Sequence, residues 1–160
     1  MPQGEMGEVV GRSGAMMSGY HGRAEATRDA TWHDAEGNRY IRHGDVGRFD
    51  EDGFLILMDR KKDLIISGGF NIYPSDLEAE LIAHPGVADC AVVGVPSEQW
   101  GETPIGFFTG TGDPAEALAW FNARVGKTQR LADLVRVDGL PRNAIGKVLK
   151  RELRDRYAPA

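Results

Sequence analysis

The spacing of apolar positions divides the chain into a β-rich first part and a second part in which strands and helices alternate. In the first part, short runs of β-branched and aromatic residues are separated by Gly- and Asp-containing turns, as in antiparallel strands. These predicted strands lie at residues 7–11, 31–32, 40–42 and 54–58. The second part has predicted strands at residues 64–66, 87–95, 105–108 and 134–137. The run at 87–95 is apolar on both alternating faces, which is typical of a central strand.

Two segments of the second part have amphipathic helical patterns. The first, at residues 75–83, begins with the S-x-x-E spacing of a capping box, Ser75 and Glu78. Its apolar face consists of Leu77, Leu81 and Ile82. The second begins at Asp113, which suits an N-cap, and ends at Gly126. Its apolar face consists of Leu118, Phe121 and Val125.

A third helix, predicted at residues 148–157, is basic. Its cations are Lys150, Arg151, Arg154 and Arg156. We expect them to form a solvated helix face. From Asp63 onward, the alternation of strands and helices predicts a compact α/β domain.

Composition narrows the possible functions. An apolar content of 41% in 160 residues supports a real core, whereas a net charge of −5 argues against nucleic acid as a partner. The one cysteine, Cys90, excludes an internal disulfide and is expected in the core. No apolar run approaches the roughly 20 residues of a membrane helix, and the scattered histidines predict no metal site. These features favour a cytoplasmic protein without a membrane span.

Polar residues with potential chemistry lie on both sides of the boundary between the two parts. The carboxylate of Asp45, in a Gly-Asp pair, can accept hydrogen bonds from two neighbouring hydroxyl groups. The guanidinium of Arg60 presents a fixed fork of donors that suits a diol or a phosphate. Lys62 belongs to a charged bend, and Gly68 with Gly69 forms a turn that a ligand can approach closely. Each of these features alone is typical of a turn or a surface position.

The segment 141–147, Pro-Arg-Asn-Ala-Ile-Gly-Lys, ends in a Gly-Lys pair that invites comparison with a P-loop. A P-loop has glycine where Pro141 stands and Ser or Thr where Val148 stands, so that interpretation fails. A lone Gly-Lys pair more often marks a solvated lysine than a site. Here the pair follows the Gly44-Asp45 motif and the paired-glycine stretch at residues 58–80, and this order favours a functional role for Lys147.

Three motifs, in this order and spacing, resemble the C-terminal portion of acyl-CoA synthetases, in the adenylate-forming (AMP-binding) enzyme superfamily. They are His43-Gly44-Asp45, the stretch 58–80 and the segment 141–147. The resemblance implies a β-rich piece of the large AMP-binding domain at residues 1–58, a hinge at 59–62 and the small C-terminal domain at 63–160. That small domain is expected to have a short mixed sheet with flanking helices. His43 stands where the family usually has threonine.

The resemblance also implies roles for six residues. Asp45 and Arg60 would bind the ribose of ATP, and Lys62 would be the hinge. Gly68 and Gly69 would line the tunnel for the pantetheine arm of CoA. Lys147 would be the catalytic residue, because its ammonium can contact the substrate carboxylate and the α-phosphate.

The implied reaction has two steps. A carboxylic acid, such as a fatty acid, attacks ATP to give an acyl-adenylate, and the thiol of CoA then displaces AMP. The chain has no phosphate loop, acyl pocket or adenine motif of a large domain. Magnesium would therefore bind through a large domain, and we expect this piece alone to be inactive.

Two alternatives stay open at this point. The chain could be a free-standing, non-catalytic small domain that binds or complements a separate large domain. It could also derive from an adenylation module of a peptide-synthesis line. The acid that is activated and the oligomeric state are not predicted.

Overall fold

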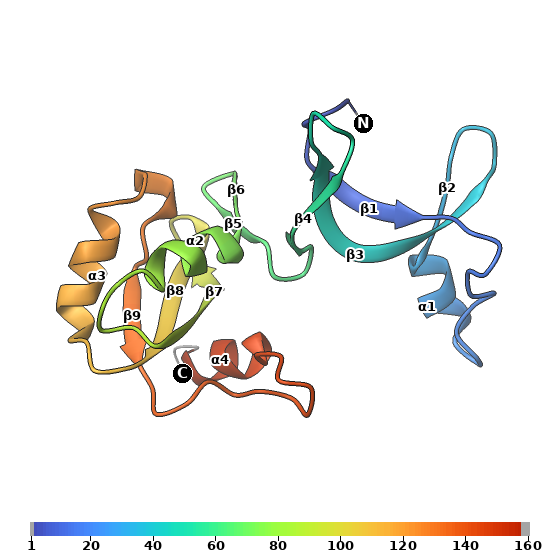
Figure 1. Ribbon diagram of the computed structural model, residues 1–160. Coiled ribbons are helices and arrows are strands. Elements are labelled where there is room, and N and C mark those ends of the chain that lie inside the picture. The colour runs from blue at the N-terminus through green and yellow to red at the C-terminus, as the bar shows by residue number, and fades with distance from the viewer. Residues whose placement is uncertain (1, 158–160) are drawn as a thin grey trace. The chain divides into compact units, whose positions relative to one another are not determined.

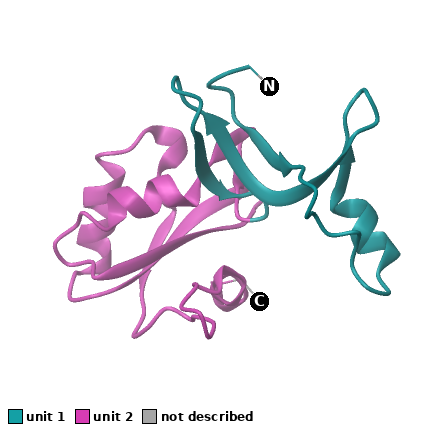
Figure 2. Cartoon of the chain, turned by 45° about the vertical axis from the view of Figure 1, so that its right-hand side comes forward, with its two compact units in different colours: residues 1–62 teal, residues 63–160 magenta. Residues whose placement is uncertain are grey.

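The computed structural model describes residues 2–157. The chain divides into two compact units, and the boundary lies between Lys62 and Asp63 (Figure 2). The first unit contains one sheet and one short helix, and the second contains a sheet with helices on both faces. We describe each unit by itself.

Unit 1 is an antiparallel sheet organised around its longest strand. Its elements are β1 (Gly7–Gly11), α1 (Ala24–Asp29), β2 (Thr31–His33), β3 (Arg39–Phe49) and β4 (Leu55–Arg60). The long β3 pairs with β1, β2 and β4 (Figure 1). The four predicted strands are confirmed. However, β3 continues to Phe49, beyond its predicted end at residue 42, because β1 and β4 both pair with its second half.

Unit 2 has a mixed sheet with flanking helices, as predicted. Its elements are β5 (Ile65–Ser67), β6 (Phe70–Ile72), α2 (Pro74–Leu81), β7 (Asp89–Ser97), β8 (Gly101–Thr109), α3 (Pro114–Asn122), the 3₁₀ helix η1 (Lys127–Gln129), β9 (Asp133–Arg136) and α4 (Lys150–Tyr157). The strand order is β6-β5-β8-β7, and β9 adds to β8 in parallel. β5 contacts the start of β8 and β9 contacts its second half, so both fit along one edge of β8.

Two apolar clusters cover the two faces of this sheet. The helices α2 and α3 lie on one face, and α4 lies on the other (Figure 1). Alternate residues of β7 and β8 point to opposite faces, as strand geometry requires. Val92 and Phe108 therefore pack with α2 and α3, whereas Val93 and Phe107 pack with Leu153 of α4. Each such buried side chain stabilises the fold by about 1.5–3 kcal/mol through removal of apolar surface from water.

Some local predictions for the helices were wrong. The N-cap of α2 is Tyr73, and the Oε1 atom of Glu78 accepts hydrogen bonds from Val92 N and Lys150 Nζ, so Ser75 and Glu78 form no capping box. Ile82 is 45% exposed, because α2 ends before it. By contrast, Asp113 caps α3 as predicted, since its Oδ1 accepts from Glu116 N at 3.0 Å.

The basic helix is only partly the solvated face that we predicted. It begins at Lys150, two residues later than expected. Lys150 pairs with Glu78 at 2.8 Å, and Arg154 pairs with the buried Asp63 at 2.9 Å. Arg151 is exposed as expected. Across residues 2–157, none of the helices has both the length and the apolar character needed to cross a membrane.

Candidate functional site

Asp45 and Arg60 meet across two neighbouring strands of unit 1. They are directly opposite each other in the β3–β4 ladder, and Arg60 Nε lies 2.8 Å from Asp45 Oδ1. A quarter of the Asp45 side chain and about half of the Arg60 side chain remain exposed, at 25% and 46%. The pair can therefore meet a ligand from solvent. A fixed carboxylate beside a guanidinium can contact a diol with acceptors and donors together.

A second charged group holds this end of the sheet, and the sequence did not reveal it. Glu8 Oε2, on β1, accepts from Arg42 Nη1 at 3.2 Å and from Lys61 Nζ at 2.9 Å. The backbone N–H of Lys61 also donates to Gly44 O at 2.9 Å. These bonds connect β1, β3 and the residue after β4, so the segment that carries Asp45 and Arg60 is tied on both sides. No local signal marks Glu8, because its partners lie 34 and 53 residues away.

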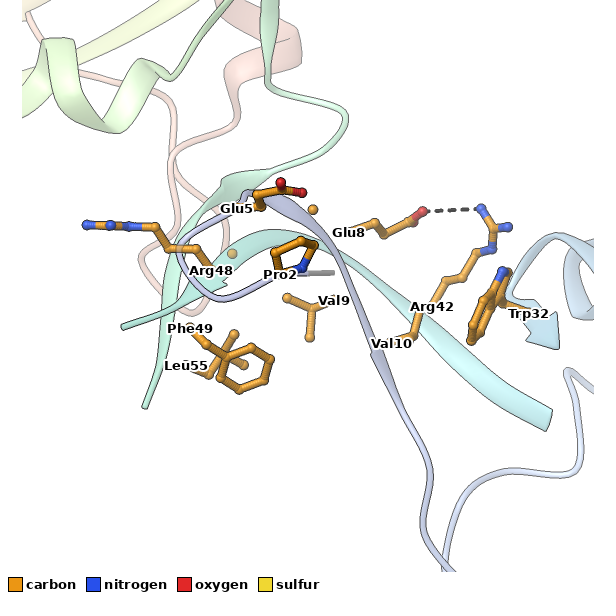
Figure 3. A pocket seen from close by; sticks show the side chains of 12 residues that line it. Pro2, Glu5, Glu8, Val9, Val10, Trp32, Arg42, Arg48, Phe49 and Leu55 are labelled. Carbon is orange, nitrogen blue, oxygen red and sulfur yellow. Dashed lines mark hydrogen bonds and ion pairs between the residues drawn. The ribbon is translucent and has the colours of Figure 1, made fainter. Parts of the chain in front are cut away.

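Beside this network, unit 1 has a hollow of about 450 Å³. Figure 3 shows the Glu8–Arg42 ion pair among its lining residues, together with Trp32. Phe49 and Leu55, which pair across the β3–β4 hairpin, contribute apolar side chains. The lining is a mixture of apolar side chains and charged groups.

The Gly68–Gly69 pair forms the tip of the β5–β6 hairpin. Both residues have positive φ, at 57° and 83°, and Ser67 pairs with Phe70 across them. A two-residue hairpin turn with φ > 0 at both positions favours glycine strongly. The N–H of Gly68 donates to Trp100 O at 2.8 Å, and a Cβ on Gly68 would lie 2.9 Å from the Trp100 ring. A Cβ on Gly69 would meet no atom within 4 Å, so its outer side is open.

Lys147 lies in an exposed turn that precedes α4. The Oδ1 atom of Asn143 accepts from the N–H groups of Ile145 and Lys147, at 3.2 and 2.9 Å. The N–H of Asn143 donates to Lys147 O at 2.9 Å. The backbone of Lys147 is therefore held by two hydrogen bonds to Asn143, while the residue remains exposed.

The six predicted site residues are divided between the two units. Asp45 and Arg60 form one group in unit 1, and the exposed Lys62 is the last residue of that unit. Gly68 with Gly69, and Lys147, occupy two different turns of unit 2. Within residues 2–157, no group of three His, Cys, Asp or Glu side chains is arranged to hold a metal ion.

Cys90 packs beside the core cluster of α2 and α3, and its thiol is poorly suited to chemistry. Burial, and then the negative charges of Glu78 and Asp89, raise the pKa of this thiol to about 12. A thiolate is the reactive form of cysteine, so Cys90 is not a nucleophile near neutral pH.

Comparisons with known proteins found a matching family model and several similar proteins. Residues 76–147 match the AMP-binding enzyme C-terminal domain. A 2-succinylbenzoate–CoA ligase of Bacillus cereus is 39% identical over 150 residues, which are 92% of this chain and 30% of that protein. A long-chain-fatty-acid–CoA ligase of Mycobacterium tuberculosis is 37% identical over 155 residues, which are 95% of this chain and 30% of that protein.

A solved structure extends the likeness to three dimensions. ATP-bound MatB from Rhodopseudomonas palustris matches 98% of this chain and 31% of its own chain, with 34% identity and a TM-score of 0.88. The chain thus spans about 30% of the length of the curated relatives that it matches.

Proposed function

The chain belongs to the adenylate-forming acyl-CoA ligase family, of which it represents a C-terminal portion, and from this premise we propose that it serves both half-reactions of an ATP-dependent acid–CoA ligase. In the first, a carboxylic acid and ATP give an acyl-adenylate and pyrophosphate. In the second, the CoA thiol displaces AMP. One observation carries the proposal: the predicted site residues can be reached from solvent and are held by ion pairs or backbone hydrogen bonds. They are the Asp45–Arg60 pair, the Gly68–Gly69 turn and the Lys147 turn.

In the first half-reaction, the Asp45–Arg60 pair holds the ribose of ATP. Arg60 fixes one carboxylate oxygen of Asp45 at 2.8 Å, which orients the group before the nucleotide arrives. A carboxylate can accept hydrogen bonds from both ribose hydroxyls, and such charge-assisted bonds are stronger than neutral ones. Orienting the ligand in this way lowers the entropic part of the barrier.

Lys147 supplies positive charge at the reacting atoms of the same step. Negative charge moves from the attacking carboxylate toward the phosphate oxygens as the adenylate forms. An ammonium held beside the reacting atoms stabilises this change electrostatically, and the fixed backbone of Lys147 limits where that ammonium can lie. The exposed side chain of Lys147 is free to extend into a site completed by a large domain.

In the second half-reaction, the Gly68–Gly69 turn lies along the pantetheine arm of CoA. A thin thiol arm needs close approach to backbone, and the open side of Gly69 permits it. The two turns of unit 2 therefore serve different steps. Lys62, at the boundary between the two units, would be the hinge that lets the chain change between those steps. Magnesium would act on the triphosphate through the large domain.

The acid is not assigned. Two relatives of similar identity act, by their names, on 2-succinylbenzoate and on long-chain fatty acids. A role in fatty-acid metabolism and a cytoplasmic location therefore remain predictions.

A graft tests the proposal with a known acid. The segment of the Bacillus cereus 2-succinylbenzoate–CoA ligase that aligns with this chain is replaced by this chain, and ATP–pyrophosphate exchange is measured with 2-succinylbenzoate. We expect exchange by the graft and none by the 160-residue chain alone. Lys147→Ala should lower the rate by about a hundredfold or more, whereas Lys127→Ala, on the exposed 3₁₀ helix, should not.

Three results would contradict the proposal. An active graft that is insensitive to Lys147→Ala removes the catalytic role of that lysine. A Lys147-dependent exchange rate in the chain alone shows that no further domain is needed. A graft that folds but never exchanges supports the non-catalytic binding domain instead.

A further inference from the structure

Arg142 connects the turn that carries Lys147 to the first residue of β7. Its Nη2 donates to Asp89 Oδ2 at 2.6 Å, and its Nη1 donates to Gly146 O at 2.5 Å. A guanidinium is suited to this arrangement because it presents several donors in a rigid plane. One side chain thus ties the residue before Lys147 to the sheet.

The turn itself has little freedom between these anchors. Gly146 has a φ of +82°, a conformation that glycine adopts easily, and its N–H donates to Asn143 O at 2.9 Å. Val148 and Arg142 form an isolated antiparallel β-bridge, and the N–H of Leu149 donates to Pro141 O at 2.7 Å. A displacement of Arg142 would therefore be transmitted to the Lys147 backbone.

The two ends of the turn are held in different ways. At its end, Lys150 pairs with Glu78, and its side chain is only 16% exposed. At its start, the side chains of Arg142 and Asp89 are each 42% exposed. An ion pair this exposed adds little to global stability. The contribution of Arg142 is therefore local, and it acts on the placement of Lys147.

We propose that Arg142 is a positioning residue, which sets the direction of Lys147 for adenylate formation by holding Gly146 O and Asp89 together. The inference rests on the proposed function, in which Lys147 acts in the first half-reaction only. Small misplacements of a catalytic group can lower a rate by about a hundredfold. Loss of Arg142 should accordingly affect one half-reaction and spare the other.

The graft described above supplies the activity test. We compare Arg142→Ala and Arg142→Lys with a matched control, Arg151→Ala, which removes a cation that is 91% exposed on α4. Adenylation is followed by ATP–pyrophosphate exchange, and thioester formation by the reaction of chemically prepared acyl-adenylate with CoA. We expect Arg142→Ala to lower kcat for adenylation by about tenfold or more, with the KM for ATP and the thioester step nearly unchanged. Arg142→Lys should retain intermediate activity.

A second measurement needs no activity. Amide hydrogen exchange of Gly146 and Lys147 is recorded by NMR in the 160-residue chain. Exchange should be faster at both amides in the Arg142→Ala variant, and unchanged in the Arg151→Ala variant.

The outcomes separate the two proposals. If Lys147→Ala leaves adenylation intact, the proposed function fails. If Lys147→Ala abolishes adenylation but Arg142→Ala matches the wild type in rate and amide exchange, only the positioning role fails. An equal loss of both half-reactions in Arg142→Ala would show general structural damage and would also overturn that role.

Discussion

The two units of this chain differ in how their apolar side chains are covered. Unit 2 buries an apolar cluster on each face of its sheet, with Phe108 and Leu153 fully shielded. Among the described residues of unit 1, Val46 is the only buried large apolar side chain, whereas Phe54 and Leu57 are 70% and 60% exposed. Unit 2 thus has its own core, whereas the sheet of unit 1 leaves most of its large apolar side chains partly or largely exposed.

This contrast agrees with the greater length of the relatives, of which the chain spans about 30%. The proposed site residues are also divided between the two units. The turns that we assign to the two half-reactions lie on the unit with a complete core, which can hold them rigidly. The Asp45–Arg60 pair lies on the unit that we expect to be completed by a large domain.

The largest expected effect comes from separating the units. Residues 63–160 expressed alone should unfold cooperatively in urea, because both of their apolar clusters are internal. Residues 1–62 alone should show no cooperative transition, since a unit of this size needs a well-buried core. Circular dichroism checks both, and a cooperative transition in residues 1–62 would contradict the contrast.

Within unit 2, Phe121→Ala should cause the greatest loss from a single substitution. Phe121 is fully buried in the cluster of α2 and α3. Truncation leaves a cavity as well as lost transfer energy, so the free energy of unfolding should fall by about 3–5 kcal/mol. Urea denaturation measures it, and a loss under about 1 kcal/mol would show that this cluster is not the core.

An intermediate effect is expected at the start of unit 2. Asp63 is 8% exposed and pairs with Arg154 of α4 at 2.9 Å. Asp63→Ala leaves the guanidinium without this partner, although Arg154 is 30% exposed and water can compensate in part. The free energy of unfolding should fall by about 1–3 kcal/mol, whereas Arg151→Ala should change it very little.

Alkaline pH should weaken unit 2 through Cys90. The pKa of its thiol is raised by burial to about 12, and an unfolded cysteine ionises near 8.5. The stabilisation from the neutral thiol is complete below the unfolded pKa and is lost as the pH rises from about 9 to 12. The wild type should lose more stability than Cys90→Ala over that range.

At pH 8, a disulfide reagent such as DTNB should label Cys90 quickly only in urea, and equally fast labelling of the folded chain would contradict its burial.

The smallest effect is expected for Phe54→Ala in unit 1. This side chain is 70% exposed, so its removal exposes almost no new surface. The free energy of unfolding of the isolated chain should change by about 0.5 kcal/mol or less. In the graft, the same substitution should cost more if a large domain covers this face, and denaturation of the graft makes that comparison.

Local patterns in the sequence predicted the elements well, and long-range pairing accounts for the errors. Strand 87–95 and the Asp113 cap depend on neighbouring residues, and both were found close to their predicted places. Glu78 had a local capping signal, but it instead bonds Val92 N and Lys150, 14 and 72 residues away. Partners that are distant in the sequence decide which hydrogen bonds such a polar side chain makes, and the neighbouring residues give no sign of those partners.

The site shows the same division. The sequence identified Asp45, Arg60 and Lys147 through motif spacing, and the structure shows that the first two touch. It did not identify Glu8 or Arg142, whose partners are brought near by strand pairing and by the return of the chain to β7. The residues that we propose to contact a ligand belong to recognisable motifs, whereas the residues that hold them in place do not.

The assignment of two turns to two half-reactions can be tested most directly in the graft. Adenylation and the reaction of prepared acyl-adenylate with CoA are measured separately for Lys147→Ala and for Gly69→Leu, which fills the open side of the hairpin turn. Gly69→Ala is the matched control, because it places a side chain at the same positive φ with much less bulk. We expect Lys147→Ala to lose adenylation by about a hundredfold while keeping the thioester step, and Gly69→Leu to show the opposite pattern. If each substitution lowers both steps alike, the two turns do not serve separate half-reactions.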